Sequence, residues 1–104
     1  MFHPDALVHR SFRRSRVRVR IMLALLAHGE LHTAGLAHAC ETSPDMIAWA
    51  MAGTRPFFAP ELSPVALGFV TSRARLGFDA FSLTPEGAQV AAALRADLRR
   101  AGGG

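Results

Sequence analysis

Residues 29–53 read GELHTAGLAHACETSPDMIAWAMAG, and this stretch decides the fold. It predicts two short helices separated by a turn near Glu41 and Thr42. His32 or Thr33 can cap the first helix, because either side chain can accept a hydrogen bond from an N–H group of the first turn. The expected inward face of this helix is Leu36, Ala37 and Cys40.

The second helix of the pair has a strong start signal. Ser43 stands at the N-cap, Pro44 at the first helical position, and Asp45 in the first turn, where the helix dipole favours a carboxylate. Gly53 ends the helix. The inward face is expected to be Ile47, Ala50 and Met51, and the outward side Pro44, Asp45, Ala48, Trp49 and Ala52.

A longer helix precedes this pair, running from Ser11 to a stop at Gly29. Its expected core face follows the helical spacing of Val17, Ile21, Ala24, Leu25 and His28. Further apolar side chains lie outside this face, which indicates that the second half of the helix is buried on two sides. We expect a second copy of the chain to cover these side chains, which are Val19, Leu23 and Leu26.

The C-terminal third predicts a β-hairpin and a last helix. Strand-like residues occupy 69–72 and 81–83, and residues 73–77 suit the hairpin tip, with Gly77 relieving the turn. Thr84 followed by Pro85 repeats the cap signal. The last helix places one apolar stripe either in the core or in a dimer interface, and this stripe is Val90, Leu94 and Leu98.

The chain of 104 residues, half of them hydrophobic, suits one domain with a real core. We expect an N-terminal arm over residues 1–10, the folded domain over 11–101 and a frayed tail over 102–104. Residues 54–60 hold two prolines and predict a loop whose Phe57 and Phe58 fold back onto the core. Residues 61–67 can form a further short stretch of helix, ended by a glycine.

This order of helices and hairpin resembles the winged helix-turn-helix family. The similarity lies in a glycine, a short helix with Leu and Ala near its middle, a turn, and a serine-capped helix with aliphatic side chains four apart. The junctions at 62–70 and 81–87 also resemble the two ends of that family's wing. The residues that carry the first similarity are Gly29, Leu31, Leu36, Ala37, Ala39, Ser43, Ile47 and Met51.

The resemblance implies an α+β fold with a three-helix core, a two-stranded β-wing and a C-terminal helix. It also implies binding to double-stranded DNA as a dimer, usually in transcription. The long connection at 53–62 looks most like small archaeal winged-helix proteins. One position departs from the pattern, because Glu41 stands where the family's turn normally holds a glycine.

Arginine is concentrated near the N-terminus, where six lie within eleven residues with no acid among them. Such a cluster suits contact with phosphates, because neutralising phosphates releases counterions and supplies sequence-independent affinity. The alternative is a solvated helix face. The six are Arg10, Arg13, Arg14, Arg16, Arg18 and Arg20, of which Arg13, Arg16 and Arg20 share one stripe.

Two further arginines, Arg73 and Arg75, lie at the expected hairpin tip. Arginine suits a narrow minor groove, whose negative potential is enhanced. Hairpin tips also carry charge for solubility alone, and the two interpretations have about equal weight.

The outward side of residues 44–52 lacks Arg, Lys, Asn and Gln, the side chains that usually read base edges. If this helix enters the major groove, Ser43, Asp45 and Trp49 are expected to lie nearest the DNA. Trp49 better suits burial or a partner protein, because aromatic side chains anchor protein interfaces. An alternative function therefore stays open, a winged-helix protein–protein interaction module that has lost sequence-specific DNA readout.

Other function classes are not favoured. The side chains of His28, His32, His38 and Cys40 can ligate zinc, but their spacings match no zinc finger, and we expect no metal or other cofactor. No nucleophile elbow, phosphate-binding loop or paired carboxylates point to an enzyme. The longest apolar run is too short for a membrane span of about 20 residues. A single cysteine and no visible secretory signal indicate a cytoplasmic protein. The sequence thus predicts a homodimeric, DNA-binding transcriptional regulator.

Overall fold

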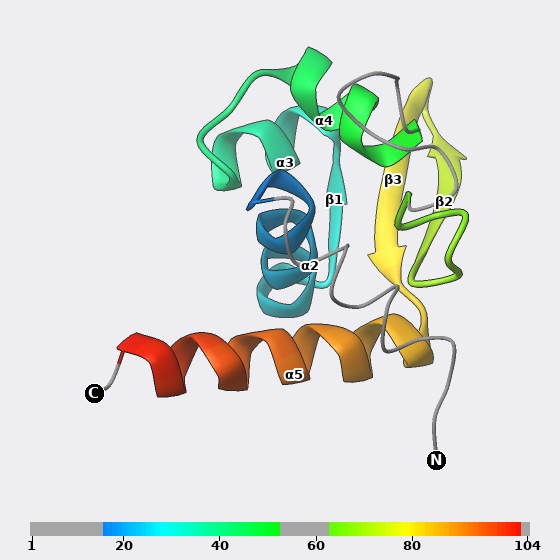
Figure 1. Cartoon of the computed structure of the whole chain (residues 1–104). Helices are drawn as coiled ribbons and strands as arrows, with labels where there is room; N and C mark the ends of the chain where they lie inside the picture. Colours follow the sequence, from blue (N-terminus) through cyan, green and yellow to red (C-terminus); the bar gives the residue numbers. More distant parts are fainter. Residues whose placement is uncertain (1–15, 53–62, 103–104) are drawn as a thin grey trace.

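The computed structural model describes residues 16–52 and 63–102 (Figure 1). The expected arm, Arg10, Arg13, Arg14 and the loop with Phe57 and Phe58 lie outside these residues. The elements, in chain order, are α2 (Arg16–His28), β1 (Glu30–His32), α3 (Thr33–Ala39), α4 (Pro44–Ala52), β2 (Val70–Arg75), β3 (Phe78–Leu83) and α5 (Pro85–Gly102). The expected α+β class is confirmed, as are the helix pair, the hairpin and the last helix.

The sheet has three antiparallel strands in the order β1-β3-β2, one more than expected. The additional strand is β1, in which Leu31 pairs with Phe81 and His32 with Ala80. Three residues are too few to show the alternation of a strand. Since β1 exists only through its pairing with β3, some 50 positions later, local sequence could not reveal it.

The hairpin has longer strands and a shorter turn than expected. Its turn consists of Leu76 and Gly77, whose φ angles are 50° and 85°. Two successive left-handed residues match the tight turns that follow the natural twist of a hairpin. The expected tip over residues 73–77 is therefore wrong in extent, because Arg73 and Arg75 belong to β2 and pair with Ala80 and Phe78.

The base of the hairpin is fixed to the first turn of α5. The Thr84 hydroxyl donates to the carbonyl of Gly68 at 2.6 Å and accepts from the N–H of Gly87 at 3.0 Å. A Cβ built on Gly87 would lie 1.8 Å from the carbonyl oxygen of Phe69. Gly87 therefore permits a contact between helix and strand that no other residue would allow. The expected cap at Thr84 is confirmed.

Residues 63–69, just before β2, form hydrogen-bonded turns rather than the expected α-helix. The Ser63 hydroxyl accepts from the N–H of Ala66 at 2.9 Å, as in a helix cap, but the segment ends within a few residues. Gly68 ends it at φ 77°, and the N–H of Phe69 then donates to the carbonyl of Pro64. Position 68 is thus the expected stop.

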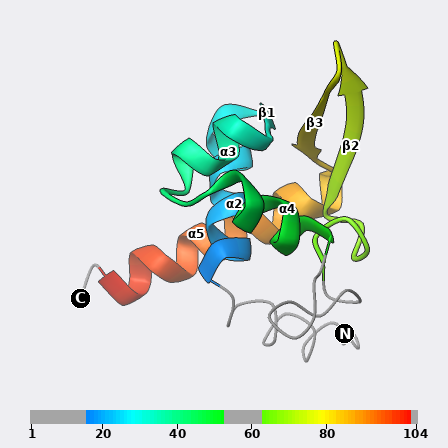
Figure 2. The same ribbon diagram turned by 90° about the horizontal axis from the view of Figure 1, so that it is seen from above.

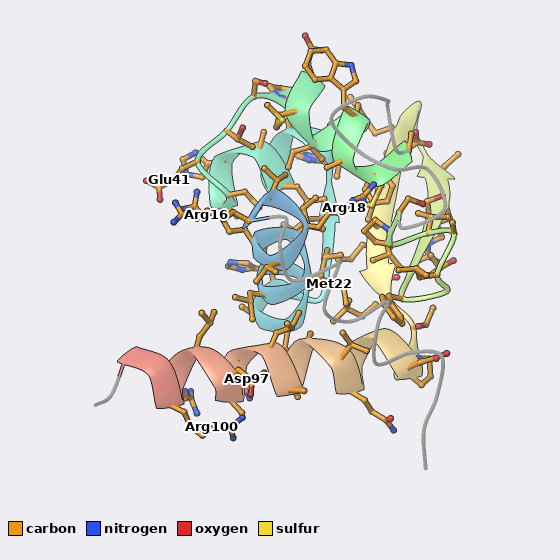
Figure 3. The ribbon with its side chains drawn as sticks, viewed as in Figure 1. Arg16, Arg18, Met22, Glu41, Asp97 and Arg100 are labelled. Atoms are coloured by element: carbon orange, nitrogen blue, oxygen red, sulfur yellow. The ribbon has the colours of Figure 1, made fainter. Side chains whose placement is uncertain are left out.

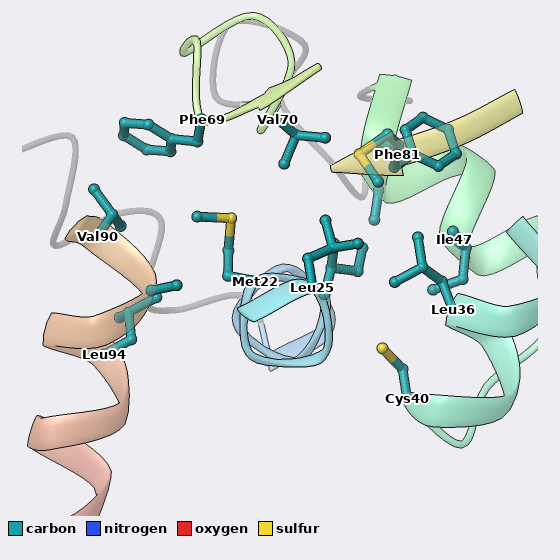
Figure 4. Close-up of a cluster of buried hydrophobic side chains, with 14 of the residues drawn as sticks. Met22, Leu25, Leu36, Cys40, Ile47, Phe69, Val70, Phe81, Val90 and Leu94 are labelled. Carbon is teal, nitrogen blue, oxygen red and sulfur yellow. The ribbon is translucent and has the colours of Figure 1, made fainter. Parts of the chain in front are cut away.

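The core surrounds α2, which packs between α5 on one side and α3, α4 and the sheet on the other (Figures 1 and 4). Its buried positions are Arg18, Ile21, Met22 and Leu25. The core face of α2 therefore differs from the predicted one. Arg18 and Met22 are buried although they were not predicted to be, and His28 is exposed although it was predicted to face the core. A charged side chain at a core position hides the true face from any apolar pattern.

Candidate nucleic-acid interface

The α3–α4 pair is held by caps that the sequence predicts. The Nδ1 atom of His32 accepts from the N–H of Gly35 at 2.9 Å, which makes His32 the N-cap of α3. The Ser43 hydroxyl accepts from the N–H of Met46 at 3.1 Å at the start of α4. Between the helices, Glu41 takes a φ of 57°, the left-handed conformation for which a glycine is usual. The turn geometry is thus kept without the glycine.

The outward side of α4 is largely apolar and carries one acid. Ile47, Ala50 and Met51 are buried, as expected, which turns the other side of the helix to solvent. Trp49 is 44% exposed there, and Asp45 is also exposed. Trp49 is therefore not buried within the chain, and its contact with a partner stays a prediction. Nothing on this side offers the forked donors that recognise base edges.

Arg18 is a structural residue and not a phosphate contact. Its side chain is only 3% exposed and points from α2 towards α4 (Figure 3). Its Nε atom donates to the carbonyl of Ala50 at 3.0 Å. Ala50 lies in the last turn of α4, where carbonyl groups have no partner within the helix. The side chain therefore anchors the C-terminal end of α4 to α2.

Arg20 acts in the same way on α3. Its Nη1 atom donates to the carbonyl of Cys40, the C-cap residue of α3, at 3.2 Å. Arg20 is still exposed along part of its length. Burial raises the pKa of the Cys40 thiol, and the nearby Arg20 guanidinium only partly offsets that effect. The thiol therefore stays protonated at neutral pH and packs as a small apolar group.

Arg16 is the remaining described arginine of the N-terminal cluster, and its side chain is exposed. It lies on the same side of the molecule as Glu41 in the α3–α4 turn (Figure 3). The first turn of α2 thus presents a cation beside the helix pair. Of the cluster, two members hold α3 and α4 and one faces solvent within the described residues.

The wing carries the other expected cations. A guanidinium nitrogen of Arg73 lies 3.3 Å from a carboxylate oxygen of Glu30 in β1, and the two side chains are 64% and 32% exposed. Arg75 is the last residue of β2, directly before the turn. Leu76 is 98% exposed and Phe78 64% exposed, with the Phe78 ring centred 6.0 Å from that of His32. The wing end therefore combines two arginines with an exposed acid, Asp79, and with exposed apolar side chains.

The residues expected at a dimer interface separate into three groups. Val90 and Leu94 are buried against α2 within one chain, so their place is the core and not an interface (Figure 4). Leu98, one turn further along α5, is 52% exposed. The other three residues are half-buried on α2 and pack partly against the core, and they are Val19, Leu23 and Leu26.

A hollow of about 500 Å³ separates α4 from the sheet. Met51 and Ala52 border it on the helix side, and Asp79 and Phe81 on the side of β3. The hollow therefore lies between α4 and β3 of the wing.

Among the described residues, no three His, Cys, Asp or Glu side chains are grouped to hold a metal ion. None of the described helices has the length and apolarity required to cross a membrane.

Sequence reasoning missed two features of this face. The structural use of Arg18 and Arg20 depends on carbonyl groups 32 and 20 positions away, which no local pattern contains. The apolar wing end was detectable, because a leucine directly before Gly77 is unusual in a hairpin turn. A predicted tip of five residues hides this signal, because Leu76 is then one loop residue among several.

Comparison with known proteins supports the same arrangement. A family model described as EarA-like matches residues 8–94. Among solved structures, the fold is similar to that of a MarR family transcriptional regulator from Silicibacter pomeroyi, with a TM-score of 0.65 and 19% sequence identity. The match covers 91% of this chain and 64% of that one, so the chain spans less than two thirds of its length. No curated protein matches the chain. At this identity, the structural likeness establishes the winged-helix fold.

Proposed function

The chain belongs to the EarA-like family, and on that basis and its winged-helix fold we propose that it binds double-stranded DNA as a homodimeric transcriptional regulator. The affinity would come chiefly from phosphate contacts. The observation that carries this proposal is the position of the cations. The first turn of α2 holds Arg16, and β2 holds Arg73 and Arg75. Both segments lie on the side of the molecule away from α5, towards α4 and the hairpin turn (Figure 1).

The cations of this end can exchange their present partners for phosphates. The Arg73–Glu30 pair is exposed on the Arg73 side and partly buried at Glu30, and exposed ion pairs contribute about 0–1 kcal/mol. A phosphate would therefore compete for Arg73 at little cost. Arg10, Arg13 and Arg14 would add their charges from the N-terminal side of α2.

The dimer would use the part of α5 that extends beyond α2 (Figure 1). Leu98 is the exposed large apolar side chain there, and burying a leucine stabilises an interface by roughly 1.5–3 kcal/mol. The half-buried side chains of Val19, Leu23 and Leu26 would supply further contacts. Sedimentation at tens of micromolar should show a dimer, and Leu98→Asp should shift it towards the monomer. A monomeric parent chain would contradict this part of the proposal.

Binding is tested by titrating the protein onto a random-sequence duplex at several salt concentrations. Affinity should fall steeply with salt, because each phosphate contact contributes about −0.9 to the slope of log K against log salt. Arg13→Ala with Arg16→Ala should make that slope shallower. Arg20 is left unchanged, because it holds the carbonyl of Cys40. A parent protein without salt-dependent duplex binding would refute the proposal.

The matched control for the arginine variant is Arg95→Ala with Arg99→Ala. Both side chains are exposed on α5, and the loss of charge is the same. Because they lie on either side of Leu98, sedimentation first checks that the variant keeps the oligomeric state of the parent. Because α5 lies at the opposite end of the molecule, the control should leave the slope unchanged. An equal loss in both variants would indicate a general effect of net charge rather than contact at the proposed face.

A second candidate function is favoured by the outward side of α4. Trp49 and its small apolar neighbours, with Asp45 beside them, suit a protein partner better than a polyanion. In this alternative the winged helix is an interaction module whose partner binds on the Trp49 surface and whose capture is insensitive to salt. The proposed location is the cytoplasm in either case. The archaeal likeness rests on residues 53–62, outside the described residues, and stays a prediction.

A further inference from the structure

The end of the wing has a residue that the hairpin itself does not require. Leu76 occupies the first position of the two-residue turn at φ 50°. Asn, Asp and Gly are preferred there, because they tolerate the left-handed conformation. A leucine is strained at this position and gains nothing from packing, since 98% of its surface is exposed. Neither the turn nor the core accounts for its presence.

The turn lies at the end of a hairpin that is hydrogen-bonded along its whole length. β2 and β3 pair over six positions up to the turn, and β1 adds a third strand along β3. The hairpin extends away from the helices, with its turn at the far end (Figure 2). Such an arm can carry a side chain into a narrow groove without losing contacts of its own.

The residues around Leu76 combine positive charge with apolar surface. Arg73 and Arg75 precede it in β2, and Phe78 follows it in β3 with 64% of its surface exposed. β2 holds no acid, whereas β3 holds one, the exposed Asp79 opposite Ala74. The Phe78 ring lies 6.0 Å from that of His32, and both residues line a hollow of about 270 Å³ next to Leu76. A single projecting leucine offers little area for a protein interface, but it suits insertion between two base pairs.

We infer that Leu76 is a minor-groove wedge, an inference that rests on the proposed DNA binding. In this arrangement the side chain of Leu76 enters the minor groove and partly separates one base step, while Arg73 and Arg75 neutralise the phosphates beside it. Proteins that bend DNA through the minor groove insert apolar side chains, leucine among them, in this way. Pyrimidine–purine steps are the easiest to unstack, so the wedge selects them.

The wedge would supply the sequence preference that α4 lacks. No side chain on the outward side of α4 has the donors that read adenine or guanine. A preference for deformable steps needs no such donors, because it depends on the energy of bending the duplex. The wing would then determine both where the protein binds and how the DNA is bent.

The test compares two duplexes that differ only in the central step, TA in one and AA in the other, and neither contains an A-tract, because the narrow minor groove of an A-tract would itself attract arginine. Affinity is measured by fluorescence anisotropy, and bending by energy transfer between dyes at the two ends. The parent protein should bind the TA duplex about tenfold more tightly and shorten its end-to-end distance. Leu76→Asn should lose both the preference and the bend, while its salt dependence stays that of the parent.

Two variants separate the wedge from a general effect on folding. Leu76→Asn should fold at least as well as the parent, since asparagine favours the left-handed conformation. Leu76→Met keeps a long apolar side chain and should retain both the preference and the bend. If Leu76→Asn binds and bends the TA duplex as the parent does, the wedge is wrong while the proposed DNA binding stands. If the parent shows no salt-dependent duplex binding, the proposed function fails and the wedge with it.

Discussion

The α4 helix and the wing lie at the same end of the molecule, yet their surfaces differ in chemistry. α4 turns Asp45, small residues and Trp49 to solvent, whereas the wing presents Arg73 and the apolar side chains of Leu76 and Phe78. In a helix-turn-helix reader of bases, the donors would be on the helix. In this chain the exposed arginine of that end lies on the wing and not on α4.

Two arginines of α2 have a structural role and are not exposed along their whole length. Arg18 and Arg20 bind the C-terminal carbonyl groups of α4 and α3, so their charges hold the helix pair in place. The cations available to a ligand are those that the helix pair does not use. The number of arginines in the sequence therefore exceeds the number that is exposed and free of contacts with the helix pair.

The largest expected loss of stability comes from disturbing the close contact between Gly87 of α5 and Phe69, the residue before β2. Gly87→Ala places a Cβ against the carbonyl of Phe69, where the backbone must move to make room. We expect the free energy of unfolding to fall by about 3 kcal/mol or more, measured by urea denaturation. Gln89→Ala, exposed on the same helix, should change it by less than about 0.5 kcal/mol. If Gly87→Ala is as stable as the parent, the close contact between α5 and the wing base does not exist.

Removing the anchor of α4 should have the next largest effect. Arg18→Met keeps an unbranched side chain but leaves the carbonyl of Ala50 without its Nε donor. The expected loss of stability is about 2 kcal/mol by thermal or urea unfolding. Arg16→Met, which removes an exposed arginine from the same helix, should cost less than about 0.5 kcal/mol. Equal stability of the two variants would show that Arg18 does not hold α4.

Relieving the turn between α3 and α4 should stabilise the protein. Glu41→Gly removes the strain of a left-handed glutamate but adds freedom to the unfolded chain, so the expected net gain is about 0.5–1 kcal/mol. Ala39→Gly, which introduces the same residue at a helical position of α3, should destabilise by about 0.5–1 kcal/mol. A loss of stability in Glu41→Gly would mean that the glutamate side chain supports the turn.

The smallest expected effect is that of the α4 surface on DNA binding. Trp49→Ala should change the affinity for a random duplex by less than about twofold, since the proposed phosphate contacts are arginines and do not include Trp49. Thermal unfolding of the same variant serves as the control for folding. A loss of affinity of about twentyfold, with folding intact, would indicate that α4 and not the wing contacts the DNA.

Much of the fold follows from local signals in the sequence. The caps at Ser43 and Thr84 were predicted, and of the two candidates for the cap of α3 the structure uses His32; each of the three accepts the hydrogen bond that a cap requires. The strand β1 was not predictable, because its three residues are ordered by β3 and not by their own alternation. The core position of Arg18 was also hidden, since its partner carbonyl lies 32 residues away. Local chemistry thus indicates where elements begin, and distant pairing decides which side chains remain for function.

The wing as the site of phosphate contact is tested most directly by the salt dependence of duplex binding. The variant Arg73→Ala with Arg75→Ala is compared with Arg95→Ala and Arg99→Ala, which remove the same charge from α5. We expect the wing variant to make the slope of log K against log salt shallower by about two for each wing that contacts the duplex, and so by about four for a dimer, and the α5 variant to leave it unchanged. An unchanged slope in the wing variant, with the parent binding duplex normally, would contradict the account.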